Sequence, residues 1–244
     1  MNHSAKLSLF PWLTLLLGAA GFGLRLWLLS KMDGGGLLPA AHPAGVLTII
    51  LLAVLLVLCF LTVRSLPPVT HYPELFPHSM AAVAGNGVAA AGFLYSAIVK
   101  IPGSGLLGIL TGLLGLTAAL CILYAGYCRL KGRRCHYLAR VIVCSYLMLH
   151  LILSCRTWGS EPQLHLYLFQ MLASIFLVLA SYYRTVLDAQ KSDRRPYIFF
   201  SQSALFCCML CVAGANALYF LAMALWMATD CCSLHWKMPR YLKQ

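Results

Sequence analysis

The stretch GSGLLGILTGLLGLTAAL, residues 103–120, contains five glycines and no charged residue. A glycine costs a helix in water about 1 kcal/mol relative to alanine, so this run is a poor sequence for a soluble helix. Its small residues recur at intervals of 3, 4, 3 and 4, which places them on one helical face: Gly105, Gly108, Gly112, Gly115 and Ala119. In a bilayer, helices associate through close backbone packing rather than through a hydrophobic force. The stretch therefore predicts a tightly packed transmembrane helix.

The segment just before it, residues 79–99, has a small-residue face with the same intervals: Ala82, Gly85, Ala89, Gly92 and Ser96. Only a few residues around Pro102 separate the two segments, so we expect an antiparallel pair of neighbours whose small-residue faces meet. The alternative is that one face remains open for a partner protein or a substrate, because bare backbone allows close approach.

The composition agrees with a chain that lies in lipid. Of 244 residues, 61% are hydrophobic and only 10% are charged, and the mean hydropathy is +0.82. A soluble domain of this length has about a quarter of its residues charged. We expect an all-α integral membrane protein, a single membrane domain over residues 1–244 with about seven transmembrane helices. Their predicted ranges are 8–30, 44–63, 79–99, 103–127, 137–158, 162–183 and 197–229.

The last uncharged interval, residues 196–229, is too long for a simple span of about 20 residues. It fits a single long tilted helix, a helix broken near Gly214 and Asn216, or a hairpin that turns at that point. Each hairpin arm would hold about 15 residues, which is short of a full crossing. We therefore expect one span with a kink.

The charge distribution sets the orientation. Eighteen Lys and Arg outnumber six Asp and Glu, and the connections 128–140 and 184–195 are rich in basic residues. The positive-inside rule places both connections and the N-terminus in the cytoplasm. Seven spans leave the basic tail after Asp230 outside, whereas a hairpin moves it inside, so the charge rule favours the hairpin. The basic connections predict contact with anionic lipids of the cytoplasmic membrane.

Nucleic acid is not expected as a partner, because the basic residues form no contiguous domain.

The first apolar run has the shape of a signal peptide, with Lys6 ahead of it and small residues at 18–20. Its apolar character continues to Leu29, beyond the length of a signal sequence. A retained first span is the favoured interpretation.

Polar side chains inside the spans are few. No Asp or Glu falls in the middle of any predicted span, which argues against carboxylate-coupled antiport and against an aspartyl membrane protease. His150 and Gln170 would meet at one depth on adjacent helices, with His165 nearer the outer rim, and Asn86 lies beside the small-residue face of residues 79–99. These four residues form either a polar pocket or structural hydrogen bonds between helices, and the structural reading is favoured.

No catalytic or cofactor-binding motif is present: GxSxG, HExxH and GxxxxGK[ST] are all missing. We expect no enzyme, no catalytic residue, no cofactor and no metal. His71, Glu74 and His78 could hold zinc, but four prolines around them favour an extended solvated loop. Cys208 and Cys211 are interpreted as packing residues.

The opening SLFPWLTLLLGAAGFGLRLWLLS, residues 8–30, followed by GLLPAAHPAG, residues 36–45, resembles uncharacterised polytopic membrane proteins of anaerobic gut bacteria. The resemblance covers the first two spans. It implies a bacterial cytoplasmic membrane and carries no activity.

The leading functional hypothesis is a small-solute permease or the membrane-embedded substrate-binding subunit of a transporter. It rests on many spans, glycine-rich faces and polar groups at a shared depth. The alternative is a non-enzymatic partner or sensor protein that docks another membrane protein through the small-residue faces.

Overall fold

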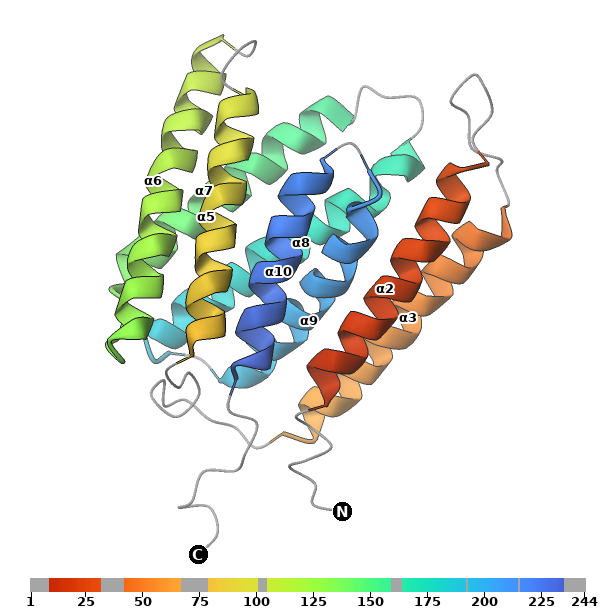
Figure 1. Cartoon of the computed structure of the whole chain (residues 1–244), viewed down its shortest axis with the longest axis horizontal. Helices are drawn as coiled ribbons and strands as arrows, with labels where there is room; N and C mark the ends of the chain where they lie inside the picture. The colour runs from red at the N-terminus through yellow and green to blue at the C-terminus, as the bar shows by residue number, and fades with distance from the viewer. Residues whose placement is uncertain are drawn as a thin grey trace, which may run out of the picture.

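The computed structural model describes residues 9–31, 42–66, 79–100, 105–158, 164–191, 193–214 and 216–234. Within these ranges the protein is all-helical, with eight helices and no strand (Figure 1). The helices are α2 (Phe10–Leu29), α3 (Pro43–Arg64), α5 (Met80–Lys100), α6 (Gly105–Leu130), α7 (Tyr137–Trp158), α8 (Leu164–Asp188), α9 (Arg194–Cys211) and α10 (Ala217–Cys232). Helices α2 to α8 in this set are long and apolar enough to cross a membrane, six in all. The chain is therefore an all-α membrane protein, and each of the first six predicted spans corresponds to one helix.

Local sequence sets several helix ends. Pro11 and Pro43 lie in the first turns of α2 and α3, where a missing N–H costs nothing. The Asp193 side chain accepts a hydrogen bond of 2.7 Å from the Arg194 N–H and caps α9. Gly132 has a φ of +63° just after α6, where a left-handed residue ends the helix. These signals stop the helices at the edges of the apolar runs.

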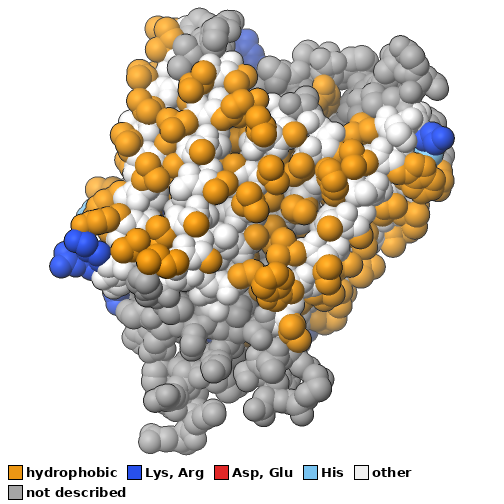
Figure 2. Space-filling model, in the orientation of Figure 1, with side chains coloured by type: hydrophobic (Ala, Val, Ile, Leu, Met, Phe, Trp, Pro, Cys, Tyr) orange, Lys and Arg blue, Asp and Glu red, His pale blue; other side chains and the backbone are white. Residues whose placement is uncertain are grey.

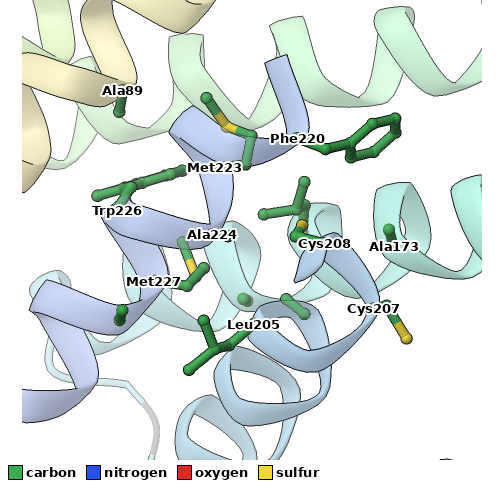
Figure 3. Packing of buried hydrophobic residues seen from close by; sticks show 14 of the residues in the cluster. Ala89, Ala173, Leu205, Cys207, Cys208, Phe220, Met223, Ala224, Trp226 and Met227 are labelled. Atoms are coloured by element: carbon green, nitrogen blue, oxygen red, sulfur yellow. The ribbon is translucent and has the colours of Figure 1, made fainter. Parts of the chain in front are cut away.

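Six helices form a closed ring. Each of α5, α6, α7, α8, α9 and α10 packs against the next, and α10 returns to pack against α5. The α2–α3 pair lies outside this ring and packs against α9 (Figure 1). Helix α9 thus has neighbours on most sides, and Figure 3 shows Leu205 and Cys208 of α9 on one side of α10 and Ala89 of α5 on the other.

The prediction of one kinked span over residues 197–229 was wrong, and the hairpin alternative describes the structure. The chain turns between Val212 and Asn216, and α10 returns beside α9. The arms are longer than the uncharged interval suggested, because Arg194 at one end and Asp230 at the other are helical and buried. The arms have 18 and 16 residues, or about 27 and 24 Å of helix. The seventh predicted span is therefore a helical hairpin, with α9 surrounded by its neighbours and α10 exposed on one face at Leu218, Leu221 and Leu225.

The hairpin returns the chain to the end of the bundle where it started. The start of α2 and the end of α10 lie at the same end, together with the connections α6–α7 and α8–α9 (Figure 1). We call this the basic end, because ten basic residues of the described ranges lie there: Arg64, Arg129, Lys131, Arg133, Arg134, Arg140, Arg184, Lys191, Arg194 and Arg195. The opposite end has Arg25, Lys31, Lys100 and Arg156. With the hairpin, the end of α10 lies at the basic end, which the positive-inside rule assigns to the cytoplasmic side.

Apolar side chains cover the outer surface between the two ends. On the face in Figure 2, hydrophobic side chains spread over the middle, and the visible Lys and Arg lie at the margins. On α6 the exposed residues lie between the small residues in the sequence and face away from the bundle. They include Leu113, Leu116, Leu120 and Leu123. An exposed apolar band between charged ends is what a bilayer requires.

The small-residue face of α5 meets α10, which corrects the expectation that it meets α6. A Cβ added at Gly85 would overlap the Thr229 side chain, and one at Gly92 would lie 2.7 Å from the Ala222 Cβ. On α6, a Cβ at Gly115 would lie 3.0 Å from Ala97 of α5 and equally close to Tyr146 of α7. Helices α5 and α6 are still extensive neighbours, and Gly115 and Gly126 of α6 pack against Ala97 and Asn86 of α5, whereas Gly85 and Gly92 of α5 pack against α10.

Gly92→Ala should destabilise the protein, whereas Gly87→Ala should not. The new methyl group at Gly92 meets the Ala222 Cβ, which cannot rotate away, while a Cβ at Gly87 has no atom within 4 Å. Both substitutions raise helix propensity by the same amount. The difference between their free energies of unfolding therefore measures the clash at Gly92, which we expect to cost about 1–3 kcal/mol. Thermal unfolding in detergent measures it. Equal stability of the two variants would contradict the α5–α10 packing.

A reporter fused after residue 234 should report the same compartment as one inserted at Gly132 in the α6–α7 connection. The reason is that α10 ends at the basic end, as α6 does. Paired cytoplasmic and extracytoplasmic reporters measure this. Opposite compartments would restore a single span for residues 197–229.

Candidate functional site

Buried charged side chains from four helices gather at the basic end. They are Arg129 of α6, Arg140 of α7, Arg184 and Asp188 of α8, and Asp230 of α10, with Tyr197 of α9 beside them. We call these six residues the arginine–aspartate network. Every member is at most 9% exposed. Charged side chains are rarely buried in membrane helices unless they have a structural or functional role.

Asp230 is the best-satisfied member of the network. Its carboxylate accepts a charge-assisted hydrogen bond from Arg129 and one of 3.0 Å from the Tyr197 hydroxyl. The Arg184 Nη1 lies 3.4 Å from its second oxygen. Arg129 also donates to the Ser233 hydroxyl. One carboxylate in the last turn of α10 thus connects α6, α8 and α9.

Asp188 is held differently. One of its oxygens lies 3.3 Å from Arg140 Nε and the other 3.8 Å from Arg184 Nε. Neither Asp188 oxygen has a hydrogen-bond donor among the described residues, although both are buried. A charge-assisted N–H···O bond is normally 2.7–2.9 Å long. Asp188 therefore has close cations but no good hydrogen bond.

The network carries one more positive than negative charge, with three arginines and two aspartates. Burying an ion pair costs several kcal/mol per ion unless geometry and hydrogen bonds compensate. Arg129 lies in the last turn of α6, where the helix dipole favours a cation. Asp230 lies in the last turn of α10, where the dipole disfavours an anion, so its arginines are required.

This network was not predicted from the sequence. Its arginines fall in the predicted cytoplasmic connections, and no carboxylate falls in mid-span, because Asp188 and Asp230 lie in the last turns of α8 and α10. The available signal was Arg184 and Asp188 at a spacing of four, which places both on one helical face. Periodicity cannot tell whether such a face points to water or to the bundle interior.

The predicted polar residues lie at different depths. His150 stacks on the Tyr219 ring of α10 at 4.7 Å, and its Nδ1 lies 3.4 Å from the Ser154 hydroxyl. Gln170 lies against the turn of the hairpin, where its Nε2 would be 2.8 Å from a Cβ at Gly214. Both side chains are buried near the opposite end. The side chain of His165 lies outside the described residues.

Asn86 belongs to another layer. Its Oδ1 accepts a hydrogen bond of 3.0 Å from Trp226 Nε1, while its Nδ2 has no hydrogen-bond partner among the described residues. Trp226 is one turn from Asp230 on α10, and about 10 Å of helix separates it from Tyr219. Asn86 therefore does not join His150 and Gln170 in one pocket.

Aromatic rings fill the space between the two polar regions. The Phe93 ring lies 5.1 Å from Tyr146 and 6.1 Å from Trp226, both edge-on. All three side chains are almost fully buried. We call Phe93, Tyr146 and Trp226 the aromatic layer. It separates the arginine–aspartate network from His150 and Gln170.

Polar partners follow α10 along one face. Tyr219, Trp226 and Asp230 are spaced by seven and four residues, which places them on one side of the helix. Their partners are His150, Asn86 and the arginines in turn. From Tyr219 to Asp230 the helix rises about 16 Å. Polar side chains thus contact α10 at three depths of the bundle, the middle one being Asn86 against Trp226 of the aromatic layer.

The other predicted residues are distributed as follows. Ala89, Gly108 and Gly112 are buried within the bundle, and Gly105 begins α6. The loop with His71, Glu74 and His78 lies outside the described residues. Among those described, no three His, Cys, Asp or Glu side chains lie together as a metal site.

All eleven cysteines are free thiols, and most are buried. Cys208 and Cys211 pack in the core of α9. Cys135, in the α6–α7 connection, packs on Ala125 and Cys128, and burial raises its pKa to about 11. At neutral pH its thiol is protonated and unreactive.

No family model, curated protein or solved structure matches this chain. The resemblance of the first two spans to uncharacterised bacterial membrane proteins stays a prediction.

Asp230→Asn should destabilise the fold by about 3–5 kcal/mol, because it leaves Arg129 and Arg184 buried without their carboxylate. Asp193→Asn is the matched control, since the Asp193–Arg195 pair is partly exposed and asparagine also caps a helix. The control should cost less than about 1 kcal/mol. Thermal unfolding of both variants in detergent measures the difference, and a stable Asp230→Asn protein would show that the network does not hold the helices together.

Proposed function

We propose that the protein is a small-solute permease, or the membrane-embedded solute-binding subunit of a transporter, in a cytoplasmic membrane. The observation that carries the proposal is the set of buried polar groups beside α10 and the turn that precedes it, from the arginine–aspartate network through Asn86 to His150 and Gln170. A scaffold helix in lipid has no need of polar partners at three depths, each of which is costly to bury.

Unsatisfied polar atoms support the same proposal. Gln170 Oε1, Asn86 Nδ2 and both polar atoms of Gln202 are buried without a hydrogen-bond partner among the described residues. Most buried polar atoms have a partner, so such exceptions need a reason. Water or a bound solute would supply the missing hydrogen bonds.

The aromatic layer suits a permease. A solute path must be closed to ions and water when no solute moves, and packed rings close it. Phe93, Tyr146 and Trp226 separate two polar regions that lie toward opposite ends of the bundle. In this arrangement each region receives solute from one side, and movement of the rings connects the two.

Docking through the small-residue faces receives no such support. Gly85 and Gly92 pack against α10, and Gly115 and Gly126 pack against side chains of α5 and α7. These glycines are used inside the bundle and cannot receive a partner helix there. The proposal is accordingly a solute-binding role without catalysis.

Anionic lipids are the second proposed partner, at the basic end. Lys131, Arg133 and Arg134 are exposed in the α6–α7 connection, and Lys191 is exposed after α8. Each basic residue close to an anionic bilayer surface contributes about 1 kcal/mol of attraction.

Native mass spectrometry in a mild detergent tests the solute-binding role. The wild type should retain a reproducible small mass, and His150→Leu or Gln170→Leu should reduce its retention by about tenfold, since each removes a hydrogen-bonding group. Met148→Leu is the control, because Met148 is on the same helix and faces outward. Absence of any retained solute, or equal retention in all the variants, would contradict the proposal.

A further inference from the structure

Two carboxylates in the arginine–aspartate network are bound to unequal extents. Asp230 accepts hydrogen bonds from Arg129 and Tyr197. Asp188 accepts none among the described residues, and its cations stand 3.3 and 3.8 Å away. The side chain of Asp188 is only 1% exposed, so bulk water does not replace the missing donors. A buried carboxylate held this loosely is a partner that another anion can displace.

The cation beside Asp188 is in a similar state. Arg140 Nε is buried and donates no hydrogen bond to any described residue, although it lies next to the Asp188 oxygen. Arg140 comes from α7 and Arg184 from α8, so two guanidinium groups approach Asp188 from different helices. A guanidinium group presents its N–H donors as a fork that matches a carboxylate or a phosphate.

The charge of the network favours the same ligand. Three arginines and two aspartates leave one positive charge in the buried cluster, and one added monoanion would make it neutral. In a low-dielectric interior this compensation is worth more than at a surface.

We propose that Arg140 and Arg184 bind an oxyanion, a carboxylate or phosphate group, and that Asp188 is an internal competitor that this oxyanion displaces. The inference rests on the proposed solute-binding function and names the class of solute. Asp230 has a separate role, because it holds Arg184 and Tyr197 in place whether or not the oxyanion is bound.

The distinguishing test is a pair of substitutions with opposite effects. Asp188→Asn removes the competitor and should tighten oxyanion binding by about tenfold, whereas Arg140→Gln removes a donor and should weaken it by at least about tenfold. Arg140→Lys keeps the charge without the fork and should bind with intermediate affinity. Arg134→Gln is the charge-matched control in an exposed position at the same end, and it should bind as the wild type does.

Binding is measured by thermal unfolding in a neutral, lipid-free detergent, with the full chain and stated probes. Inorganic phosphate and acetate test a free oxyanion, with chloride as their control. Phosphatidylglycerol tests a lipid headgroup, with phosphatidylcholine as its control. The proposal predicts stabilisation by at least one oxyanion and the opposite responses of Asp188→Asn and Arg140→Gln. If Arg140→Gln does not fold, Asp188→Asn and Arg140→Lys test the proposal instead: the first should bind the oxyanion more tightly than the wild type and the second more weakly.

Two results would overturn the oxyanion site: no oxyanion stabilises the wild type or Asp188→Asn, or Asp188→Asn binds more weakly than the wild type. The oxyanion site would also be overturned if native mass spectrometry found a neutral solute whose retention is the same in Arg140→Gln and in the wild type. The solute-binding function would then stand. Conversely, phosphatidylglycerol as the one ligand found would leave the oxyanion site standing and contradict the solute-binding function.

Discussion

The bundle depends on one buried carboxylate, Asp230 in the last turn of α10. Arg129 of α6, Arg184 of α8 and Tyr197 of α9 all meet it, so a single side chain connects four helices at the basic end. A hydrophobic force cannot hold helices together in lipid, and a directional charged contact can. The contact also fixes the rotation of each helix, because a helix turned by one residue would move its arginine or tyrosine away from Asp230.

The hairpin of α9 and α10 follows from the same constraint. Helix α9 carries two arginines in its first turn and several polar side chains, and it is not among the helices apolar enough to cross a membrane. Nearly all of it is buried, because α8, α10, α2 and α3 surround it. The strongly apolar α3 can face lipid instead, with a row of exposed side chains such as Val54, Val57 and Leu61. The most polar helix therefore lies inside and the most apolar one outside, the reverse of a soluble protein.

Close backbone contacts complete the packing and leave room for polar groups. Gly85 and Gly92 bring α5 against α10, and Gly18 and Gly21 bring α2 against Met209 and Leu210 of α9. These contacts place Asn86 and Trp226 within hydrogen-bonding distance in the interior.

The sequence by itself determined the class of fold, six of the spans and the basic end. Length and uncharged composition decide whether a helix can cross a bilayer, and both are local properties. It also showed that the faces containing Gly85 and Gly115 are packing faces, because a helical period is readable from one segment. Which helix each face meets, the hairpin at residues 212–216 and the arginine–aspartate network were decided only by the tertiary structure. The physical reason is that a charge within one turn of a helix end, such as Asp230 or Arg129, can point to water or to the interior at the same sequence position. Only the packing of α6, α8, α9 and α10 around Asp230 selects the interior.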